Sequence, residues 1–578
     1  MLENCLKTEL GSSFMLNAGI CGFIRFMEHN NAEKGKDYDY QGQSLFIDID
    51  YLKNNDISEM YISTMSEIFE ENTKHFRTLN EKHEIDKLNS IGIDNLDDKQ
   101  KKRITELYKN FADLLVKSSY LSAYEMLSDV DNITPINKDI IEDLKKESDL
   151  SVKHEKYNNI YQIINQKKIK DSLIYTDLLY DYFKLFFSEN SQSHKITRLC
   201  EKNKKYSDTF KNNFISPLFD EMDIPQKKKS AICIECLGTM SATEVQKKKR
   251  RLTFLFDIAD DLDRKKSYYW FCKPDAYVCP LCNFIYAFIP LGFAFIGSEA
   301  VFINSNSTIE TLIKIMSAQR EKISETSNLS VRKRIMRTFT EEKIDALEKT
   351  NSNIQIILRS PDIGDEKTKK KKSHFVFDVI DKDMIRNLKK GSKYLSMLEK
   401  KWVTFDSKKF ISVYDNIFDM ILNKHSLYPF IDKALKNEID KSNNINYLKG
   451  VLRLEIIFNG GTSMDELNKK IDFAFMSGKA LRESILGKEA AKSSENGAEA
   501  DDNRLRGLVY RLVNLTAVGD CSQFIDTVIR IYAGYGLTIP TVFKDCYKSD
   551  EMFKAISHGF ILGLKYAAYE KNNDKQED

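Results

Sequence analysis

The stretch that decides the organisation of this chain is Cys233-Ile234-Glu235-Cys236, followed after 42 intervening residues by Cys279-Pro280-Leu281-Cys282. Two cysteines separated by two residues can turn both sulfurs toward one point, so the two pairs together can supply four thiolates to one tetrahedral ion. Zinc is the usual occupant of such a set, and four thiolates leave no coordination position open for water or substrate. The sequence therefore predicts a structural zinc site whose ligands are Cys233, Cys236, Cys279 and Cys282.

Two other interpretations of these cysteines stay open at this point, namely unligated core cysteines and a redox pair. A thioredoxin-type dithiol needs a single Cys-x-x-Cys beside a βαβ pattern. Cys272 lies between the two pairs and is a fifth candidate, but its spacing fits neither of them.

The composition is that of a folded protein. At 578 residues, with 42% hydrophobic and 11% aromatic residues, the chain is long enough for two to four domains with sizeable cores. The net charge is only +2. Any contact with a polyanion must therefore come from local patches of positive charge.

Cysteine use and hydropathy favour a soluble cytoplasmic protein. Only four of the ten cysteines stand in a paired motif, which suits a reducing compartment. The apolar segment 14–27 contains Arg25 and has neither a basic region before it nor a small-residue cleavage site. The most apolar segment, 284–296, is too short to span a bilayer and contains a proline and a glycine, so we predict buried strands there.

The N-terminal part of the chain has a mixed pattern. Alternation over 45–51 predicts a strand, and apolar stripes over 104–115 and 178–187 predict helices. We expect the region 225–305 to be rich in strands and loops. Strands are predicted at 354–358 and 375–380, with a polar hairpin or loop at 365–372 between them, and the pattern is helical from about Asn387 onward.

The last 130 residues have the pattern of a helical bundle. A helix is predicted to begin at Met464, and apolar faces recur over 505–513, 524–532 and 553–564, with a flexible loop at 487–503. The fold class is therefore α+β, with a four-cysteine zinc module inserted in a mixed N-terminal region and an all-α bundle after it. We place the N-terminal α+β region at 1–224, the zinc module at 225–305, the remainder of the N-terminal region with connecting helices at 306–445, and the bundle at 446–578.

A catalytic set is not apparent in the sequence. The eight histidines are scattered, and neither a phosphate-binding Gly-x-x-x-x-Gly-Lys-Ser/Thr loop nor a Gly-x-Ser-x-Gly elbow occurs. An acidic cluster could bind a hard cation, but its basic neighbours favour a solvated helix or loop face; its members are Asp257, Asp260, Asp261 and Asp263. We expect a protein that is not an enzyme.

Basic residues gather in the segment between the cysteine pairs. Clustered cations on an otherwise neutral chain are typical of contact with a phosphate backbone, although a solvated surface is the alternative. The candidates for nucleic-acid binding are Lys247, Lys248, Lys249, Arg250, Arg251, Lys265 and Lys266. Tyr268, Tyr269 and Trp270 follow directly and could stack on unpaired bases, or pack in a core.

These residues together resemble a known family. The two cysteine pairs with their basic spacer, the stretch from Asn17 to Phe26 (NAGICGFIRF) and the stretch from Phe524 to Tyr532 (FIDTVIRIY) are similar to the CXXC–CXXC family of CRISPR proteins. That family is the large subunit of the type I-B Cascade effector complex.

The resemblance implies a non-catalytic subunit of a crRNA-guided antiviral complex. Such a subunit recognises a protospacer-adjacent motif on target double-stranded DNA, helps to open the strands and docks the helicase-nuclease. Its partners are the crRNA and the backbone, crRNA-processing and small subunits. The C-terminal bundle resembles the small subunit, which related systems make separately from an internal start; Met464 is our candidate start and Met476 its rival.

Two alternatives belong to other functional classes. The first is a zinc-ribbon nucleic-acid-processing enzyme or accessory subunit, for which the acidic cluster would have to hold catalytic metal. The second is an interaction scaffold that binds no nucleic acid, which salt-insensitive binding of its partners would support.

Overall fold

The structure of the protein is a computed structural model. It describes residues 4–11, 13–92, 95–117, 120–121, 123–124, 138–181, 206–241, 278–296, 299–325, 354–361, 373–405, 410–438, 446–461, 464–486 and 499–566. The fold is mixed α+β with a four-cysteine cluster and a helical C-terminal region, which confirms the predicted fold class.

The chain divides into two compact units. Unit 1 comprises Met1–Ser324 and Ile354–Phe377, and unit 2 comprises Glu325–Asn353 and Asp378–Asp578. The finer division at 224, 305 and 445 stays a prediction.

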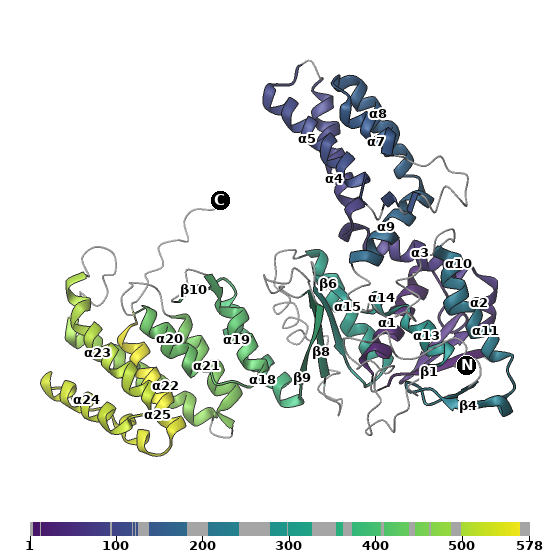
Figure 1. Cartoon of the computed structure of the whole chain (residues 1–578). Helices are drawn as coiled ribbons and strands as arrows, with labels where there is room; N and C mark the ends of the chain where they lie inside the picture. The colour runs from purple at the N-terminus through teal and green to yellow at the C-terminus, as the bar shows by residue number, and fades with distance from the viewer. Residues whose placement is uncertain are drawn as a thin grey trace, which may run out of the picture. The chain divides into compact units, whose positions relative to one another are not determined.

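Unit 1 contains two small sheets and a two-stranded hairpin (Figure 1). A three-stranded sheet has the order β1-β3-β2, and β4 pairs with β5 in a hairpin. A four-stranded sheet has the order β6-β7-β8-β9, with its last strand continuing into unit 2. The strands are β1 (Cys5–Glu9), β2 (Tyr38–Gln41), β3 (Ser44–Asp48), β4 (Lys229–Ile232), β5 (Thr239–Ser241), β6 (Ala294–Ile296), β7 (Glu299–Asn304), β8 (Ile354–Pro361) and β9 (Ser373–Ile380).

The predicted strands at 354–358 and 375–380 correspond to β8 and β9. The strand predicted at 45–51 corresponds to β3 only as far as Asp48, because α2 begins at Ile49, where the Asp48 side chain caps the helix. The predicted loop or hairpin segment 365–372 lies outside the described residues. Its flanking strands β8 and β9 are nonetheless neighbours in the sheet.

The apolar stripe predicted at 104–115 lies in the C-terminal part of α5, which is one of the helices of unit 1. They are α1 (Phe14–His29), α2 (Ile49–Asn54), α3 (Ile57–Phe69), η1 (Glu70–Asn72), α4 (Lys74–Ser90), α5 (Asp98–Leu115), α7 (Lys138–Lys146), α8 (Leu150–Ile164), α9 (Lys167–Asp181), α10 (Tyr206–Phe210), η4 (Lys211–Ile215), α11 (Ser216–Met222), η5 (Gln226–Lys228), α13 (Pro280–Tyr286), α14 (Ile289–Gly292) and α15 (Ile309–Glu325). Helices α4, α5, α7, α8 and α9 share one hydrophobic core. The helix predicted at 178–187 is described only as far as the end of α9 at Asp181.

The prediction of buried strands over 284–296 is wrong for most of that segment. Helices α13 and α14 occupy it, and only the last residues enter β6. Every residue from 284 to 292 is buried, so no polar face reveals a helical period in this segment of the sequence. The prolines begin these helices instead of interrupting a strand, since Pro280 and Pro290 each stand in a first helical turn.

Helix α1 is the central element of this core. It packs against α13 and α14, and the aromatic ring of Phe23 contacts those of Phe284 and Phe288 at centroid distances of 5.7 and 5.1 Å. Tyr61 of α3 donates a 2.6 Å hydrogen bond to the backbone oxygen of Ala287, between α13 and α14. The segment that carries the second cysteine pair is thus fixed to the middle of unit 1.

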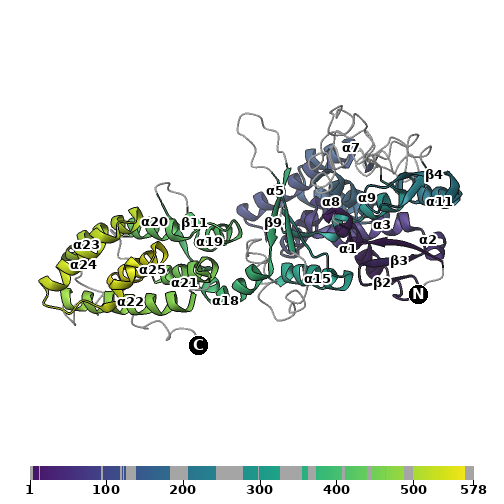
Figure 2. The ribbon, with the colours of Figure 1, turned by 90° about the horizontal axis from the view of Figure 1, so that it is seen from below.

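Unit 2 is a helical assembly with one short β-ribbon (Figure 2). Its elements are α18 (Lys382–Leu398), β10 (Trp402–Thr404), β11 (Phe410–Ser412), α19 (Val413–Leu422), α20 (Tyr428–Glu438), α21 (Tyr447–Asn459), α22 (Met464–Leu486), α23 (Glu499–Val518), α24 (Cys521–Gly534), η10 (Thr541–Tyr547) and α25 (Asp550–Leu564). The helices predicted from 464, 505, 524 and 553 correspond to α22, α23, α24 and α25. The loop predicted at 487–503 is wrong for its last five residues, because α23 already begins at Glu499, and residues 487–498 lie outside the described part. The ribbon β10–β11 corrects the prediction of an uninterrupted helical pattern after Asn387, because three-residue strands are too short to show alternation clearly.

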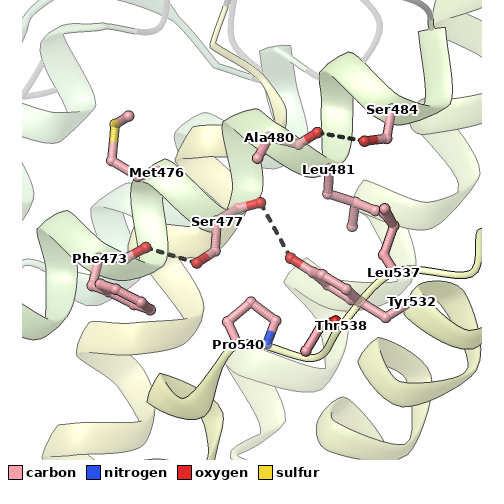
Figure 3. A pocket seen from close by; sticks show the side chains of 10 residues that line it. All are labelled: Phe473, Met476, Ser477, Ala480, Leu481, Ser484, Tyr532, Leu537, Thr538 and Pro540. Atoms are coloured by element: carbon pink, nitrogen blue, oxygen red, sulfur yellow. Dashed lines mark hydrogen bonds between the residues drawn. The ribbon is translucent and has the colours of Figure 1, made fainter.

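One pocket of about 430 Å³ lies on unit 2 between α22 and the segment after α24 (Figure 3). Its walls are mainly apolar, and Tyr532 crosses it to donate a 3.2 Å hydrogen bond to the backbone oxygen of Ser477. The lining residues are Phe473, Met476, Ser477, Ala480, Leu481, Ser484, Tyr532, Leu537, Thr538 and Pro540. This lining includes neither a carboxylate nor a histidine nor a cysteine.

Across the part of the chain that the structure describes, no helix combines the length and apolar character needed to cross a membrane.

Candidate metal centre

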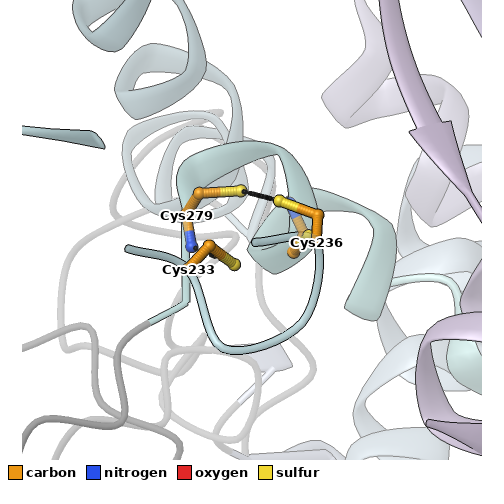
Figure 4. Close-up of side chains that lie close together, drawn as sticks. Cys233, Cys236 and Cys279 are labelled. Carbon is orange, nitrogen blue, oxygen red and sulfur yellow. Dashed lines mark hydrogen bonds between the residues drawn. The ribbon is translucent and has the colours of Figure 1, made fainter. Parts of the chain in front are cut away.

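The four predicted cysteines converge on one point. Figure 4 shows three of them, Cys233, Cys236 and Cys279, close together. The four sulfur atoms all lie within 4.8 Å of one another, and Cys236 Sγ is 3.7 Å from Cys279 Sγ. That separation is far longer than a disulfide bond of about 2.05 Å. It matches the distance of about 3.8 Å between two sulfurs that each lie about 2.3 Å from a shared tetrahedral zinc ion.

The first pair sits in the turn that joins β4 to β5. The backbone amide of Cys233 donates to the carbonyl of Gly238 at 2.9 Å, and the amide of Leu237 donates to the carbonyl of Cys233 at 3.0 Å. Leu237 has a φ of +57°, and a side chain at position 238 would place its Cβ only 3.2 Å from Cys236 Sγ. The glycine therefore leaves room for the thiol while the turn aims both sulfurs inward.

The second pair stands at the beginning of α13. Cys279 is the N-cap residue, and its sulfur accepts a hydrogen bond from the amide of Cys282 at 3.4 Å. The amide of Cys279 in turn donates to Cys233 Sγ at 3.3 Å. This last contact links the two pairs across the long sequence gap.

Contacts on both sides attach the cluster to the core of unit 1. Glu221 of α11 accepts a 3.0 Å hydrogen bond from the amide of Ser241 and forms a 3.6 Å ion pair with Lys229, which fixes the β4–β5 hairpin. Helix α13 approaches α1 closely at Gly19, where an added Cβ would lie 2.6 Å from the Ile285 carbonyl oxygen. The cysteine cluster thus joins a surface hairpin to the central helix of the unit.

Glu235, between the first two cysteines, faces this helical core. Burial raises the pKa of its carboxyl, while hydrogen bonds from Tyr286 and Ser13 act in the opposite direction. Tyr286 lies on α13, and Ser13 immediately precedes α1. Sequence reasoning missed Ser13, Tyr286 and Glu221 as supports of the site, since nothing in their spacing connects them to the cysteines.

The close approach of four thiols makes their ionisation interdependent. Contacts with Cys236, Cys279 and Cys282 hold the pKa of the Cys233 thiol well below its usual range. Contacts with Cys233 and Cys236 raise the pKa values of the Cys279 and Cys282 thiols well above the usual range of a thiol, and burial raises them further. Contacts with Cys279 and Cys282 also lower the pKa of Cys236. The thiols of the second pair thus stabilise negative charge on the first pair, whereas four thiolates together require a cation among them.

The cluster fits a metal ion such as zinc in both donor type and geometry. Cys233, Cys279 and Cys282 are buried, and Cys236 is exposed, so one edge of the cluster is open to solvent. Among the described residues this is the one group of three or more histidine, cysteine or acidic side chains close enough to hold a metal. With all four positions filled by sulfur, such an ion would hold the hairpin to the helix and would have no position for a substrate.

The predicted nucleic-acid-binding residues all lie outside the described part of the chain. This applies to Lys247, Lys248, Lys249, Arg250, Arg251, Lys265 and Lys266, and also to Cys272, the acidic cluster and the aromatic run ending at Trp270. In the part that is described, Lys227 and Lys228 of η5 are exposed directly before the β4–β5 hairpin.

A family model matches this part of the chain. Residues 226–294 match the family described as CRISPR-associated protein (Cas_CXXC_CXXC). This segment of the chain is therefore similar to the CXXC–CXXC family of CRISPR-associated proteins. The match runs from η5 through both cysteine pairs to the start of β6, about one eighth of the chain. No curated protein matches the chain.

Proposed function

We propose that this protein is the non-catalytic large subunit of a crRNA-guided, type I-B Cascade effector complex in the cytoplasm. In this role it recognises a protospacer-adjacent motif on target duplex DNA, helps to separate the strands and docks the helicase-nuclease. The observation that carries the proposal is the match of residues 226–294, which coincides with the four-cysteine cluster. The partners would be the crRNA and the backbone, crRNA-processing and small subunits.

The metal in this proposal is a structural zinc ion held by Cys233, Cys236, Cys279 and Cys282. Its support is the sulfur-only donor set within 4.8 Å and the attachment of both pairs to the surroundings of α1. The zinc would hold the ends of the basic spacer at a defined place on unit 1. It would take no part in chemistry.

Nucleic-acid contact is assigned to the basic residues of that spacer, 247–251 together with Lys265 and Lys266. Their charge supports the assignment, because sequence-independent binding to a nucleic-acid backbone comes mainly from lysine and arginine. Exposed Lys227 and Lys228 add positive charge next to the same hairpin. Sequence readout in such complexes belongs mostly to guide pairing, while the protein reads a short motif.

The C-terminal helices 464–564 would correspond to the small subunit of such complexes. The predicted start at Met464 coincides with the first residue of α22. No observation in the described residues favours the alternative of a zinc-ribbon nucleic-acid-processing enzyme.

Purification with the products of the neighbouring genes tests the function. We expect the tagged protein to retain RNA of one defined length, and the complex to bind duplex DNA. Replacing the five basic residues 247–251 with glutamine should weaken duplex binding about equally for all sequences and flatten its dependence on salt, because fewer counterions are released. The readouts are RNA sequencing of the bound fraction and duplex affinity at several salt concentrations.

Absence of RNA from the purified complex would contradict the proposed function. An unchanged salt slope in the glutamine variant would leave the complex intact but would remove the assignment of these basic residues to the DNA backbone.

A further inference from the structure

Two large aromatic side chains stand exposed on the β10–β11 ribbon of unit 2. Trp402 is 59% exposed and Phe410 is 75% exposed. Isolated exposed apolar residues are common on protein surfaces, but two aromatic rings on one short ribbon form a local apolar face.

The strand register places both rings on the same side of the ribbon. Thr404 pairs with Phe410 and Trp402 pairs with Ser412, so the two aromatics occupy diagonal positions on one face. The other face carries Val403, which is buried, and Ile411. Diagonal positions on such a pair are about 7–8 Å apart, so both rings are accessible to one extended ligand.

The ribbon is held firmly although its outer face is open. Asn437 of α20 donates a 2.7 Å hydrogen bond to the carbonyl of Thr404, and the amide of Val413 donates a 3.0 Å hydrogen bond to the carbonyl of Lys401. The ring of Phe405 packs edge-on against Phe430 at 5.8 Å. The ribbon that carries the exposed rings is therefore fixed at both ends of β10. Its backbone lies beside α19 and α20 (Figures 1 and 2).

Positive charge adjoins the aromatic face. Lys400 and Lys401 immediately precede Trp402, and both are exposed. Neither forms an ion pair with another residue in the part of the chain that the structure describes. Their charges are available to a phosphate group that lies beside the rings.

We infer that the β10–β11 ribbon binds unpaired bases of a nucleic-acid strand, with Trp402 and Phe410 as stacking surfaces and Lys400 and Lys401 as phosphate contacts. Every base has a flat face, so stacking on aromatic rings holds a single strand without requiring one sequence. Paired bases inside a duplex do not offer these faces. The inference rests on the proposed function, since a complex that opens DNA produces such unpaired bases.

Tryptophan fluorescence offers a direct measurement of stacking. The chain contains two tryptophans, so Trp270→Phe leaves Trp402 as the sole tryptophan. In this variant of the full-length protein, we expect a 15-nucleotide oligothymidylate to quench the emission, and a 15-base-pair duplex to leave it unchanged. An oligouridylate of equal length forms a second arm: stronger quenching by the DNA strand points to the DNA strand left unpaired when the duplex opens, and stronger quenching by the RNA strand points to the guide.

Substitutions test the energetic role of the rings. We expect Trp402→Ala and Phe410→Ala each to weaken oligothymidylate binding by about tenfold, with Trp402→Phe retaining most of the affinity. Tyr547→Ala is the matched control, because Tyr547 is 62% exposed on η10 of the same unit. It should bind the single strand as the unchanged protein does.

Three results would overturn the inference. The first is that neither single strand quenches the emission. The second is that the two alanine variants lose single-strand and duplex binding equally. The third is that the alanine variants keep single-strand binding but lose a protein subunit from the purified complex. In each case a complex that still carries RNA and binds duplex DNA would leave the proposed function standing. If the unchanged protein binds no nucleic acid at all, the proposed function fails as well.

Discussion

At the residue scale, glycines decide how closely the helices of unit 1 approach one another. An added Cβ at Gly22 of α1 would overlap the backbone oxygen of Phe288, and one at Gly292 of α14 would overlap the backbone oxygen of Ala18. These helices meet backbone to backbone, so no neighbouring side chain can move aside to make room. The stretch from Asn17 to Phe26, recognised in the sequence by its resemblance, thus has a packing requirement of its own.

We predict that Gly22→Ala lowers the free energy of unfolding of unit 1 by about 3 kcal/mol, because the overpacked backbone must shift. Urea unfolding of the full-length chain, followed by circular dichroism, measures the change. Gly507→Ala is the control: Gly507 lies within α23 with no neighbouring atom within 4 Å, so alanine there should stabilise the helix by about 0.5–1 kcal/mol. Equal stability of Gly22→Ala and the unchanged protein would show that α1 and α14 can separate at little cost.

At the element scale, the pairing of α22 with α25 bears on the proposed internal start. Leu467, Ile471, Ala474 and Phe475 of α22 are buried, and all of them precede Met476. A product that begins at Met476 would lack them. A product that begins at Met464 would retain the whole of α22 and its contact with α25.

The α22–α25 segment also depends on helices that precede it. His558 of α25 pairs with Asp432 of α20 at 2.9 Å, and Arg453 of α21 binds the carbonyl of Asn468 at 3.0 Å and the carboxylate of Asp472. Separation of the segment 464–578 would break both connections and expose apolar residues of α21.

We predict that a small-subunit product begins at Met464 and not at Met476, and that the segment 464–578 is less stable alone than the segment 378–578. Mass spectrometry of the small band in the purified complex identifies its first residue. Urea unfolding of the two segments compares their stability, and the shorter one should unfold at lower urea because it has lost buried apolar contacts. A band that begins at neither methionine would remove the proposed internal start, and equal unfolding midpoints would show that α20 and α21 add no stability.

At the scale of the whole molecule, each unit has its own core, and the cysteine cluster belongs to unit 1 alone. The loss of a metal from that cluster should therefore lower the stability of unit 1 and leave that of unit 2 unchanged. A chain with two separately packed units also unfolds in more than one step, which makes the two responses distinguishable.

We predict that replacing Cys233 and Cys236 with serine releases zinc and lowers the unfolding temperature of unit 1, while the transition of unit 2 stays unchanged. Structural zinc contributes directly to folding energy, and on the order of several kcal/mol of unit 1 stability should be lost. Zinc content, measured with a metallochromic dye, and calorimetric unfolding are the readouts. A metal-free protein with an unchanged first transition would contradict a structural role for the ion.

Cys521→Ser is the matched control for that experiment. Cys521 lies in unit 2, where its sulfur donates a 3.5 Å hydrogen bond to the carbonyl of Cys546, and a serine hydroxyl can keep this bond. The variant should retain zinc and both transitions. Because Cys236 is exposed, a strong chelator should also be able to reach the edge of the cluster in the unchanged protein.

The sequence by itself determined those features that depend on neighbours along the chain. The two-residue gap in each Cys-x-x-Cys pair lets both sulfurs turn to one side, and the four sulfurs do come together. Apolar stripes at helical spacing predicted α5, α23, α24 and α25. They are recognisable because a helix with one solvent-exposed face repeats its apolar residues every 3.6 positions.

Only the tertiary structure decided the features that depend on distant parts of the chain. The segment 284–296 is helical where strands were predicted, since burial on every side removes the periodicity from which a helix is recognised. The supports of the cysteine cluster, Glu221, Ser13 and Tyr286, come from separate elements and carry no shared spacing. The exposure of Trp402 could likewise not be predicted from the sequence, because the elements that pack over a residue, and not its neighbours along the chain, decide its access to solvent.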